Sequence, residues 1–150
     1  MNSCRNAFLL IGLTVLSNIA MTQKEDYTWI LGYSSSRQNA DPTVGTTIVR
    51  FANEQLHMTR DTIEANFNHT SSLISDPKTG ELILYSDGCR VWDRRHKRVK
   101  GLEEINRDSY FWGPYYGSSL TQNILILPDP SAEHKYRLIY LWYDKLRPDT

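Results

Sequence analysis

One pattern occurs twice in this sequence of 150 residues, with the copies about 50 residues apart. The first copy covers residues 73–85 and the second covers residues 125–142. Each copy consists of an apolar stretch, a turn that contains Asp76-Pro77 or Asp129-Pro130, and a second apolar stretch. A hairpin that recurs at this period predicts stacked β-modules, with β-propeller blades as the leading case.

Other stretches also predict strands. Residues 27–33, 46–51 and 89–93 are apolar or β-branched, whereas residues 53–68 fit either a strand with turns or a short helix, and strand is favoured by their neighbours. Residues 136–143 are apolar on both faces, which indicates a sheet packed between neighbours. The predicted fold class is therefore all-β, with antiparallel hairpins forming about two β-propeller blades. Because a propeller needs about four or more blades, we expect a fragment of a larger propeller.

The first 22 residues are typical of a secretory signal peptide, and we expect residues 23–150 to form the partial propeller domain. Arg5 provides a positive start, residues 7–16 are apolar, and Ala20 follows other small residues suited to cleavage. The apolar run of about ten residues is short beside the roughly 20 of a membrane-spanning helix, although an uncleaved anchor is left open. No later stretch is expected to cross a membrane. The predicted location is secreted or at the cell surface, in the periplasm or on the outer-membrane exterior.

The charge balance limits the classes of partner, and the cysteine content limits the possible disulfides. The sequence has 17 basic and 17 acidic residues, and this balance argues against nucleic acid or an anionic membrane as the main partner. Once the signal peptide is removed, Cys89 is the remaining cysteine, so an intrachain disulfide is not expected. The apolar residues around Cys89 favour a small buried side chain over a reactive thiol.

Residues 110–116 are the stretch most suggestive of ligand binding, because they contain five aromatic residues on a predicted loop. Such side chains can stack on sugar rings or hold a peptide, and they can equally pack the loop onto the sheets. The neighbouring polar residues would add contacts to a ligand or satisfy backbone groups at a strand start; they are Ser118, Ser119, Thr121 and Gln122. The predicted ligand-binding residues are Tyr110, Trp112, Tyr115 and Tyr116.

Asp76, Asp87, Asp93 and His96 form the densest group of potential metal ligands. Their spacing does not match a calcium-binding loop, and aspartates in turns usually bond their own backbone, so we predict no metal site and no cofactor. His96 lies in the basic run 94–100 and is predicted to be a solvated surface residue. The run itself is interpreted as the charged side of an edge strand in preference to a site for an anionic polymer.

The order of several short motifs carries a family resemblance. The motifs are Ile74-Ser75-Asp76, Gly80-Glu81-Leu82, Tyr85-Ser86-Asp87-Gly88, Val91-Trp92-Asp93, His96, Gly117-Ser118-Ser119, Thr121-Gln122 and Ile126-Leu127-Pro128-Asp129-Pro130. Together they resemble the N-terminal β-propeller region of large secreted proteins of the Bacteroidetes, which often carry gliding-motility or secretion-sorting domains at their C-terminal end. The resemblance covers about residues 29–142 and implies a secreted or cell-surface propeller.

No motif for a catalytic nucleophile or a phosphate-binding loop occurs in the sequence. We therefore predict an exported, non-enzymatic β-propeller module that binds a protein or glycan at the cell surface. One alternative is a propeller-based hydrolase or lyase, in which Asp87, Asp93 and His96 would be the first residues to test. The other alternative is a truncated remnant without independent function.

Overall fold

The computed structural model describes residues 26–32, 45–52, 55–67, 69–105 and 117–142. These residues form eight β-strands and contain no helix. The strands are β1 (Thr28–Gly32), β2 (Thr46–Ala52), β3 (Gln55–Asp61), β4 (Ser72–Ser75), β5 (Leu82–Ser86), β6 (Val91–Asp93), β7 (Ile124–Pro128) and β8 (Tyr136–Tyr140).

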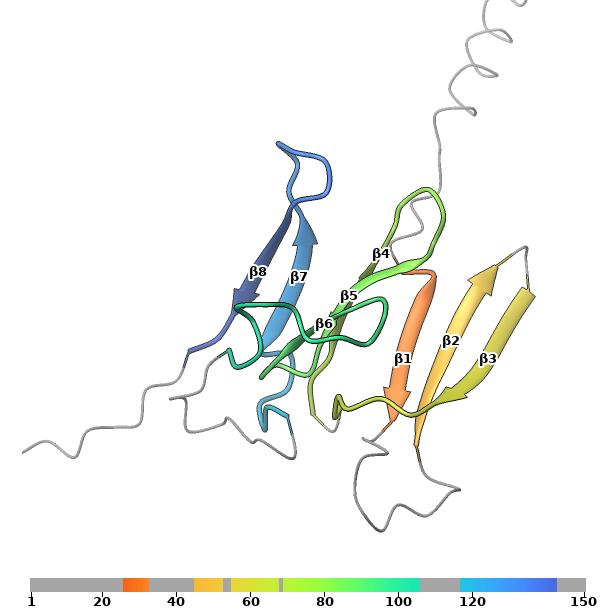
Figure 1. The fold of residues 1–150 in the computed structure, drawn as a ribbon, viewed down its shortest axis with the longest axis horizontal. Coiled ribbons are helices and arrows are strands. Elements are labelled where there is room, and N and C mark those ends of the chain that lie inside the picture. The colour runs from red at the N-terminus through yellow and green to blue at the C-terminus, as the bar shows by residue number, and fades with distance from the viewer. Residues whose placement is uncertain (1–25, 33–44, 53–54, 68, 106–116, 143–150) are drawn as a thin grey trace, which may run out of the picture.

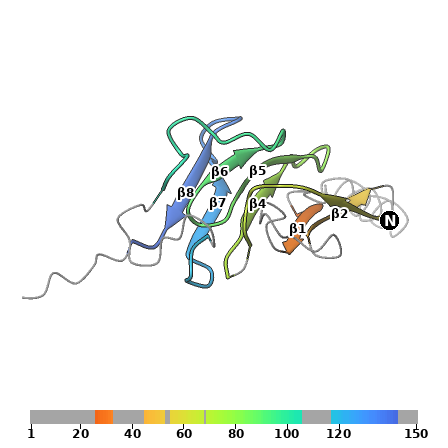
Figure 2. The same ribbon diagram turned by 60° about the horizontal axis from the view of Figure 1, so that its bottom comes forward.

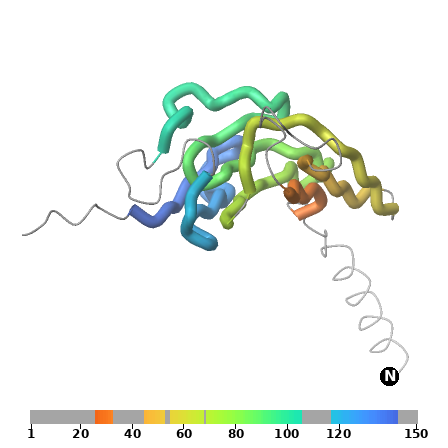
Figure 3. The backbone as a smooth tube through the Cα atoms, turned by 90° about the horizontal axis from the view of Figure 1, so that it is seen from below, coloured from red at the N-terminus to blue at the C-terminus, as the bar shows by residue number. Residues whose placement is uncertain are grey.

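The strands form three antiparallel sheets, and strands that follow each other in the chain are neighbours in each sheet. The first sheet contains β1, β2 and β3, the middle sheet contains β4, β5 and β6, and the third sheet contains β7 and β8. They lie side by side in chain order (Figure 1), and the view from below gives the same order (Figure 3). Strand β1 contacts β4 and β4 contacts β7, so the first strands of the three sheets are neighbours. The all-β, antiparallel prediction is confirmed.

Residues 28–61 contain a three-stranded sheet of their own. The ambiguous stretch at residues 53–68 contains a strand, as favoured from the sequence, because β3 pairs with β2 from Thr46↔Asp61 to Ala52↔Gln55. As a result the described residues hold three sheets, where the sequence indicated about two repeating modules. The basic run 94–100 is not the edge strand that the sequence predicted. It forms a turn after β6, and a single bridge joins Arg98 to Trp92.

Two hydrophobic cores lie on opposite sides of the middle sheet. The core toward the first sheet contains Ile30, Ile48, Ile63, Ala65, Leu82, Tyr85 and Trp92. The core toward the third sheet contains Val91, Ile105 and Ile124, with Leu84 and Leu138 packed against them. Strand β5 contributes to both cores because it contains a bulge. The pairing with β4 shifts there from Ile74↔Leu84 to Ser75↔Leu82. Residues two apart on a strand normally share a face, and the extra residue lets Leu82 and Leu84 serve different cores.

The two copies of the Asp-Pro hairpin differ in how they are covered. Strands β4 and β5 belong to the middle sheet and are packed on both faces, as expected from the repeat. The β7–β8 hairpin is packed on one face only, because Leu125, Ile139 and Leu141 on its other face are exposed. The prediction that residues 136–143 are buried on both faces is therefore wrong for the described part of that strand.

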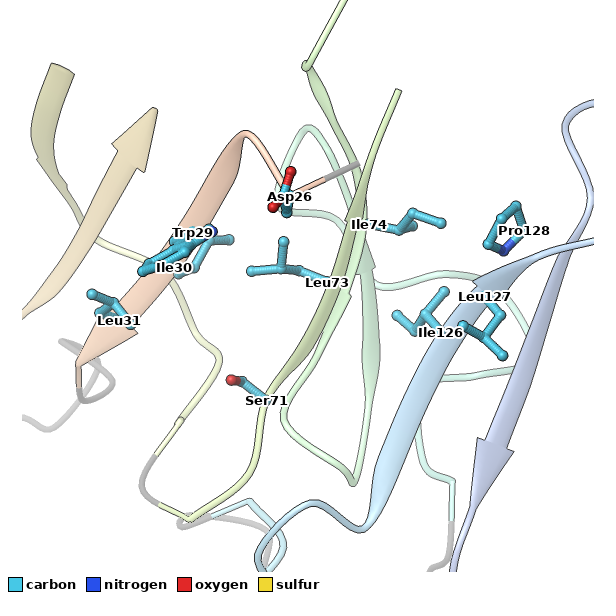
Figure 4. Close-up of a pocket in the computed structure, with 10 residues that line it drawn as sticks. All are labelled: Asp26, Trp29, Ile30, Leu31, Ser71, Leu73, Ile74, Ile126, Leu127 and Pro128. Carbon is cyan, nitrogen blue, oxygen red and sulfur yellow. The ribbon is translucent and has the colours of Figure 1, made fainter. Parts of the chain in front are cut away.

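Strand β1 runs in the opposite direction to β4 and β7. In Figure 4 the residues of β1 descend from Trp29 to Leu31, whereas β4 rises through Ile74 and β7 rises to Pro128. The cause is the number of strands in the first sheet: three antiparallel strands finish at the end opposite to where they began, and β4 starts at that end. Figure 2 shows the same succession of sheets from a second direction.

Hydrogen bonds to side chains join the first strands of neighbouring sheets, and these strands are not paired through their backbones. The Ile126 N–H donates to Ser72 Oγ at 2.8 Å, which joins β7 to β4. The Thr28 hydroxyl donates to the carbonyl of Gly80 at 3.0 Å, which joins β1 to the turn after β4. These bonds satisfy buried polar groups and set the spacing of the sheets without fusing them into one.

Candidate functional site

A groove of about 580 Å³ lies where β1, β4 and β7 come together. Its walls carry Trp29 and Leu31 from β1, Leu73 from β4, and Ile126 and Leu127 from β7 (Figure 4). A concave, mainly apolar surface with a few polar groups is the usual form of a binding site in proteins. The groove is therefore the strongest candidate for a functional site in the described residues.

The aromatic wall of the groove is held in a fixed orientation. The ring of Trp29 meets that of Phe51 edge to face, with centroids 5.6 Å apart and an interplanar angle of 68°. Edge-to-face pairs of this kind are favourable because the ring edge is positive and the ring face is negative. The indole of Trp29 remains 46% exposed and so offers apolar surface to a ligand.

Polar groups stand at the two ends of the groove. Asp26 lies near its upper end and Ser71 near its lower end in Figure 4. The carboxylate of Asp26 accepts hydrogen bonds, and the hydroxyl of Ser71 both donates and accepts. This arrangement suits a ligand that has an apolar middle and hydrogen-bonding groups at both ends.

A second groove, of about 360 Å³, lies between the two Asp-Pro turns. Asp76 and Asp129 occupy equivalent places there. Asp76 Oδ1 accepts bonds from the N–H groups of Lys78 (2.9 Å) and Thr79 (2.7 Å), and Asp129 Oδ1 accepts one from Ser131 N–H (2.9 Å). Both carboxylates thus fix their own turns, as the sequence analysis favoured for Asp76.

The turn contacts predict an unusually acidic carboxyl at Asp129. The Ser131 hydroxyl and N–H and the Arg137 guanidinium lower the pKa of Asp129 from 3.8 to about 2. A lowered pKa stabilises the fold above pH 3.8, and this contribution is lost as the pH falls through about 2. We expect NMR titration to give an Asp129 pKa of about 2 and Ser131→Ala to raise it toward 3.8. Ser119→Ala, in another turn, is the control, and an unchanged pKa in Ser131→Ala would reject this account.

The other two aspartates also have structural partners. Asp87 is fully buried, and its Oδ1 accepts bonds from the N–H groups of Cys89 and Arg90, both at 3.0 Å. Burial raises the pKa of Asp87, whereas the bonds from Cys89 and Arg90 act to lower it. Asp93 Oδ1 accepts bonds from the N–H groups of Arg95 (2.8 Å) and Lys97 (3.0 Å). Both residues therefore form turns, which agrees with the reading favoured from the sequence.

His96 is not the solvated surface residue that the sequence predicted. Its Nδ1 lies 2.9 Å from the hydroxyl oxygen of buried Tyr85, and its Nε2 lies 3.4 Å from Asp61 Oδ2. Burial raises the pKa of Tyr85, so this hydroxyl stays protonated. His96 therefore links the end of β3 in the first sheet to the middle sheet. Asp61 lies far from His96 in the sequence, and for that reason this contact could not be predicted from the sequence.

The basic run is partly neutralised by acidic residues of neighbouring segments. Arg98 makes an ion pair with Glu64, and Arg98 lowers the pKa of Glu64. Arg94 Nη1 lies 3.6 Å from Glu81 Oε2. These contacts weaken the case for a site that binds an anionic polymer.

The polar residues that follow Gly117 have a structural role. Ser118 is buried, and its Oγ accepts bonds from Asn123 Nδ2 and from the N–H of Leu120. Ser118 N–H in turn donates to the carbonyl of Asp87 at 3.0 Å, which joins the middle sheet to the start of the third. Cys89 is buried, so the prediction of a small buried side chain is confirmed.

The predicted ligand-binding residues Tyr110, Trp112, Tyr115 and Tyr116 lie outside the described residues. The groove was not predicted from the sequence, because Trp29, Leu73 and Ile126 have the pattern of ordinary strand residues. The available signal was the repeat itself, since equivalent strands of stacked modules are expected to be neighbours.

Comparison with known protein families, with curated proteins and with solved structures found no match for this chain. Within the described ranges, no cluster of three or more His, Cys, Asp or Glu residues is suited to hold a metal ion. The same part of the chain has no helix long and apolar enough to cross a membrane.

Proposed function

We propose that this chain is an exported, non-enzymatic module that forms consecutive blades of a β-propeller and binds a protein ligand at the cell surface. The observation that carries the proposal is the groove, which is built from the first strands of three consecutive antiparallel sheets. In a propeller, blades of antiparallel strands stand around a central channel. Strands β1, β4 and β7 are neighbours, as the strands that line such a channel would be, but β1 runs in the opposite direction to the other two.

The composition of the groove favours a protein segment over a sugar. Its walls are mostly aliphatic, and Trp29 is the aromatic residue among the side chains that line it. Sugars are commonly held by aromatic rings with many polar partners, whereas apolar peptide side chains need mainly apolar walls. An extended peptide with apolar side chains, and an N–H or cationic group near Asp26, matches this surface.

Export is supported by the N-terminal sequence, where a positive residue, an apolar run and small residues follow one another. A non-enzymatic role is supported by the partners of the aspartates considered for catalysis. Asp93 is bonded by N–H groups of its own turn. Asp87 is bonded by N–H groups of its own turn and by the N–H of Asn66, and it forms a buried ion pair with Arg90. A place at the cell surface rests on the order of the sequence motifs alone.

A bulky residue in the groove tests the proposal. We expect the purified chain to retain members of a displayed library of short linear peptides, and Ser71→Trp to reduce their retention at least about tenfold, or 1.4 kcal/mol. Ser71 is exposed, so the substitution fills the groove without entering a core. Ser119→Trp, at an exposed serine outside the groove, should bind as the wild type does.

The same proteins would be applied to a glycan array. Retention of glycans without peptides, with loss in Ser71→Trp, would show a carbohydrate ligand and reject the protein ligand. Equal retention of peptides by wild type and Ser71→Trp would reject the groove as the site.

A further inference from the structure

The first and third sheets each expose an apolar face. Cross-strand pairing places Trp29 and Leu31 of β1 on the same face of the first sheet as Phe51 of β2 and Leu56 and Met58 of β3. All five are exposed, from 40% for Phe51 to 66% for Met58. We call this surface the first-sheet face.

The third sheet also has an exposed apolar face. Leu125 and Leu127 of β7 share one face with Ile139 of β8 and with Leu141, whose N–H continues the pairing by bonding the carbonyl of Asn123 at 2.9 Å. Their exposed fractions run from 38% for Leu127 to 59% for Leu141. We call this surface the third-sheet face. The two sheets that carry these faces stand at opposite ends of the row in Figure 1.

We infer that these two faces bind each other between copies of this chain, with the third-sheet face of one copy on the first-sheet face of the next. The inner faces of the same two sheets pack through residues of the same kind, because Ile30 and Ile48 face one core and Ile124 and Leu138 face the other. A contact between copies repeats the stacking that already joins the sheets within one chain. This inference goes beyond the proposed ligand binding, although Trp29, Leu31 and Leu127 belong both to these faces and to the walls of the groove.

The exposed area favours a closed pair of copies over a single contact. With about 200 Å² for a fully exposed large apolar side chain, the exposed fractions give roughly 500 Å² on the first-sheet face and roughly 400 Å² on the third-sheet face. One contact then buries roughly 900 Å², which is less than the range of about 1,200–2,000 Å² for stable interfaces. Two contacts in a closed pair bury roughly 1,800 Å² and fall within it. The pair would hold six sheets, within the usual range of about 4–8 for propellers.

Each contact joins two different faces, and a two-fold axis relates the two contacts of the closed pair. This arrangement predicts a distinctive response to substitution. Met58→Lys damages the first-sheet face and Ile139→Glu damages the third-sheet face. Each variant keeps the other face intact. A mixture of the two variants can therefore form one wild-type contact and one contact in which the introduced charges are opposite.

Analytical ultracentrifugation of the full chain is the test. We expect wild type to sediment as a dimer, each single variant as a monomer, and the equimolar mixture again as a dimer. Thr59→Lys, at an exposed position of β3 on the opposite side of the strand from Met58, is the control and should remain dimeric. Circular dichroism would confirm that the variants keep their strand content, since neither Met58 nor Ile139 lies in a core.

Several results would overturn the inference. A monomeric wild type at high concentration would show that copies of the chain do not cover these faces. Dissociation by only one of the two variants would indicate like faces in contact, and failure of the mixture to associate would also exclude the head-to-tail arrangement. Loss of peptide binding in Ser71→Trp with the dimer intact would separate this interface from the groove.

Discussion

Trp92→Ala is expected to lower the free energy of unfolding by about 3–5 kcal/mol, the range for removal of a large aromatic side chain from a core. Trp92 is fully buried on β6, and its ring stacks on that of Tyr85 with centroids 5.4 Å apart and an interplanar angle of 10°. Tyr85 also contacts Phe67, which follows the first sheet, and His96 in the turn after β6, so this pair joins the middle sheet to both segments. Because a domain of this size is stable by only about 5–15 kcal/mol, such a loss would remove a large part of its stability.

Urea unfolding followed by far-UV circular dichroism would measure the effect of Trp92→Ala. Trp142→Ala is the matched control, because Trp142 is 52% exposed and its removal leaves no internal cavity. We expect a change within about 0.5 kcal/mol for that surface substitution. Equal losses of unfolding free energy in the two variants would contradict the assignment of Trp92 to the core toward the first sheet.

Gly88→Ala is expected to be nearly as damaging, at about 2–5 kcal/mol, because it combines backbone strain with a steric clash. Gly88 has φ +82°, and an added Cβ would lie 2.5 Å from Asn123 Oδ1, 2.7 Å from Thr70 Cγ2 and 2.8 Å from Ser118 Cβ. Asn123 and Ser118 belong to the segment that enters β7. The clash would therefore separate the middle sheet from the third sheet.

Gly101 provides a closely matched control for this substitution. It has the same φ of +82°, but an added Cβ would meet no atom within 4 Å. Gly101→Ala should therefore show the backbone strain alone, about 1–2 kcal/mol. Thermal unfolding of both variants measures the difference, and equal shifts in the midpoint would show that the close approach at Gly88 is relieved without cost.

Local features of the fold could be predicted from the sequence because short-range chemistry determines them. Aspartate bonds its own turn and proline fixes the next backbone angle, so Asp76-Pro77 and Asp129-Pro130 located two hairpins. The β-branched residues 46–51 predicted β2 for a similar reason. The basic run was misread because charge alone does not distinguish an edge strand from a turn. His96 has a φ of 60° in this turn, and a histidine does not by itself predict that conformation.

The groove could not be predicted in the same way, because it depends on contacts between distant segments. Trp29 and Leu127 are nearly a hundred residues apart in the chain and line the same surface only after three sheets have stacked. The direction of β1 relative to β4 follows from the odd number of strands in the first sheet. That number is odd because residues 53–68 contain one strand. The sequence favoured a strand there but did not show where it would pair.

The reversal of β1 also determines where the chain enters this fold. Asp26 precedes β1 at the same end of the molecule as the turns that follow β4 and β7 (Figure 4). Tyr27 lies close against Gly80 there, since a Cβ on that glycine would be 3.0 Å from the tyrosine side chain. A bulky tag or fusion partner attached just before Asp26 would therefore crowd both Asp-Pro hairpin tips, whereas one inserted near Ser119 would leave them open.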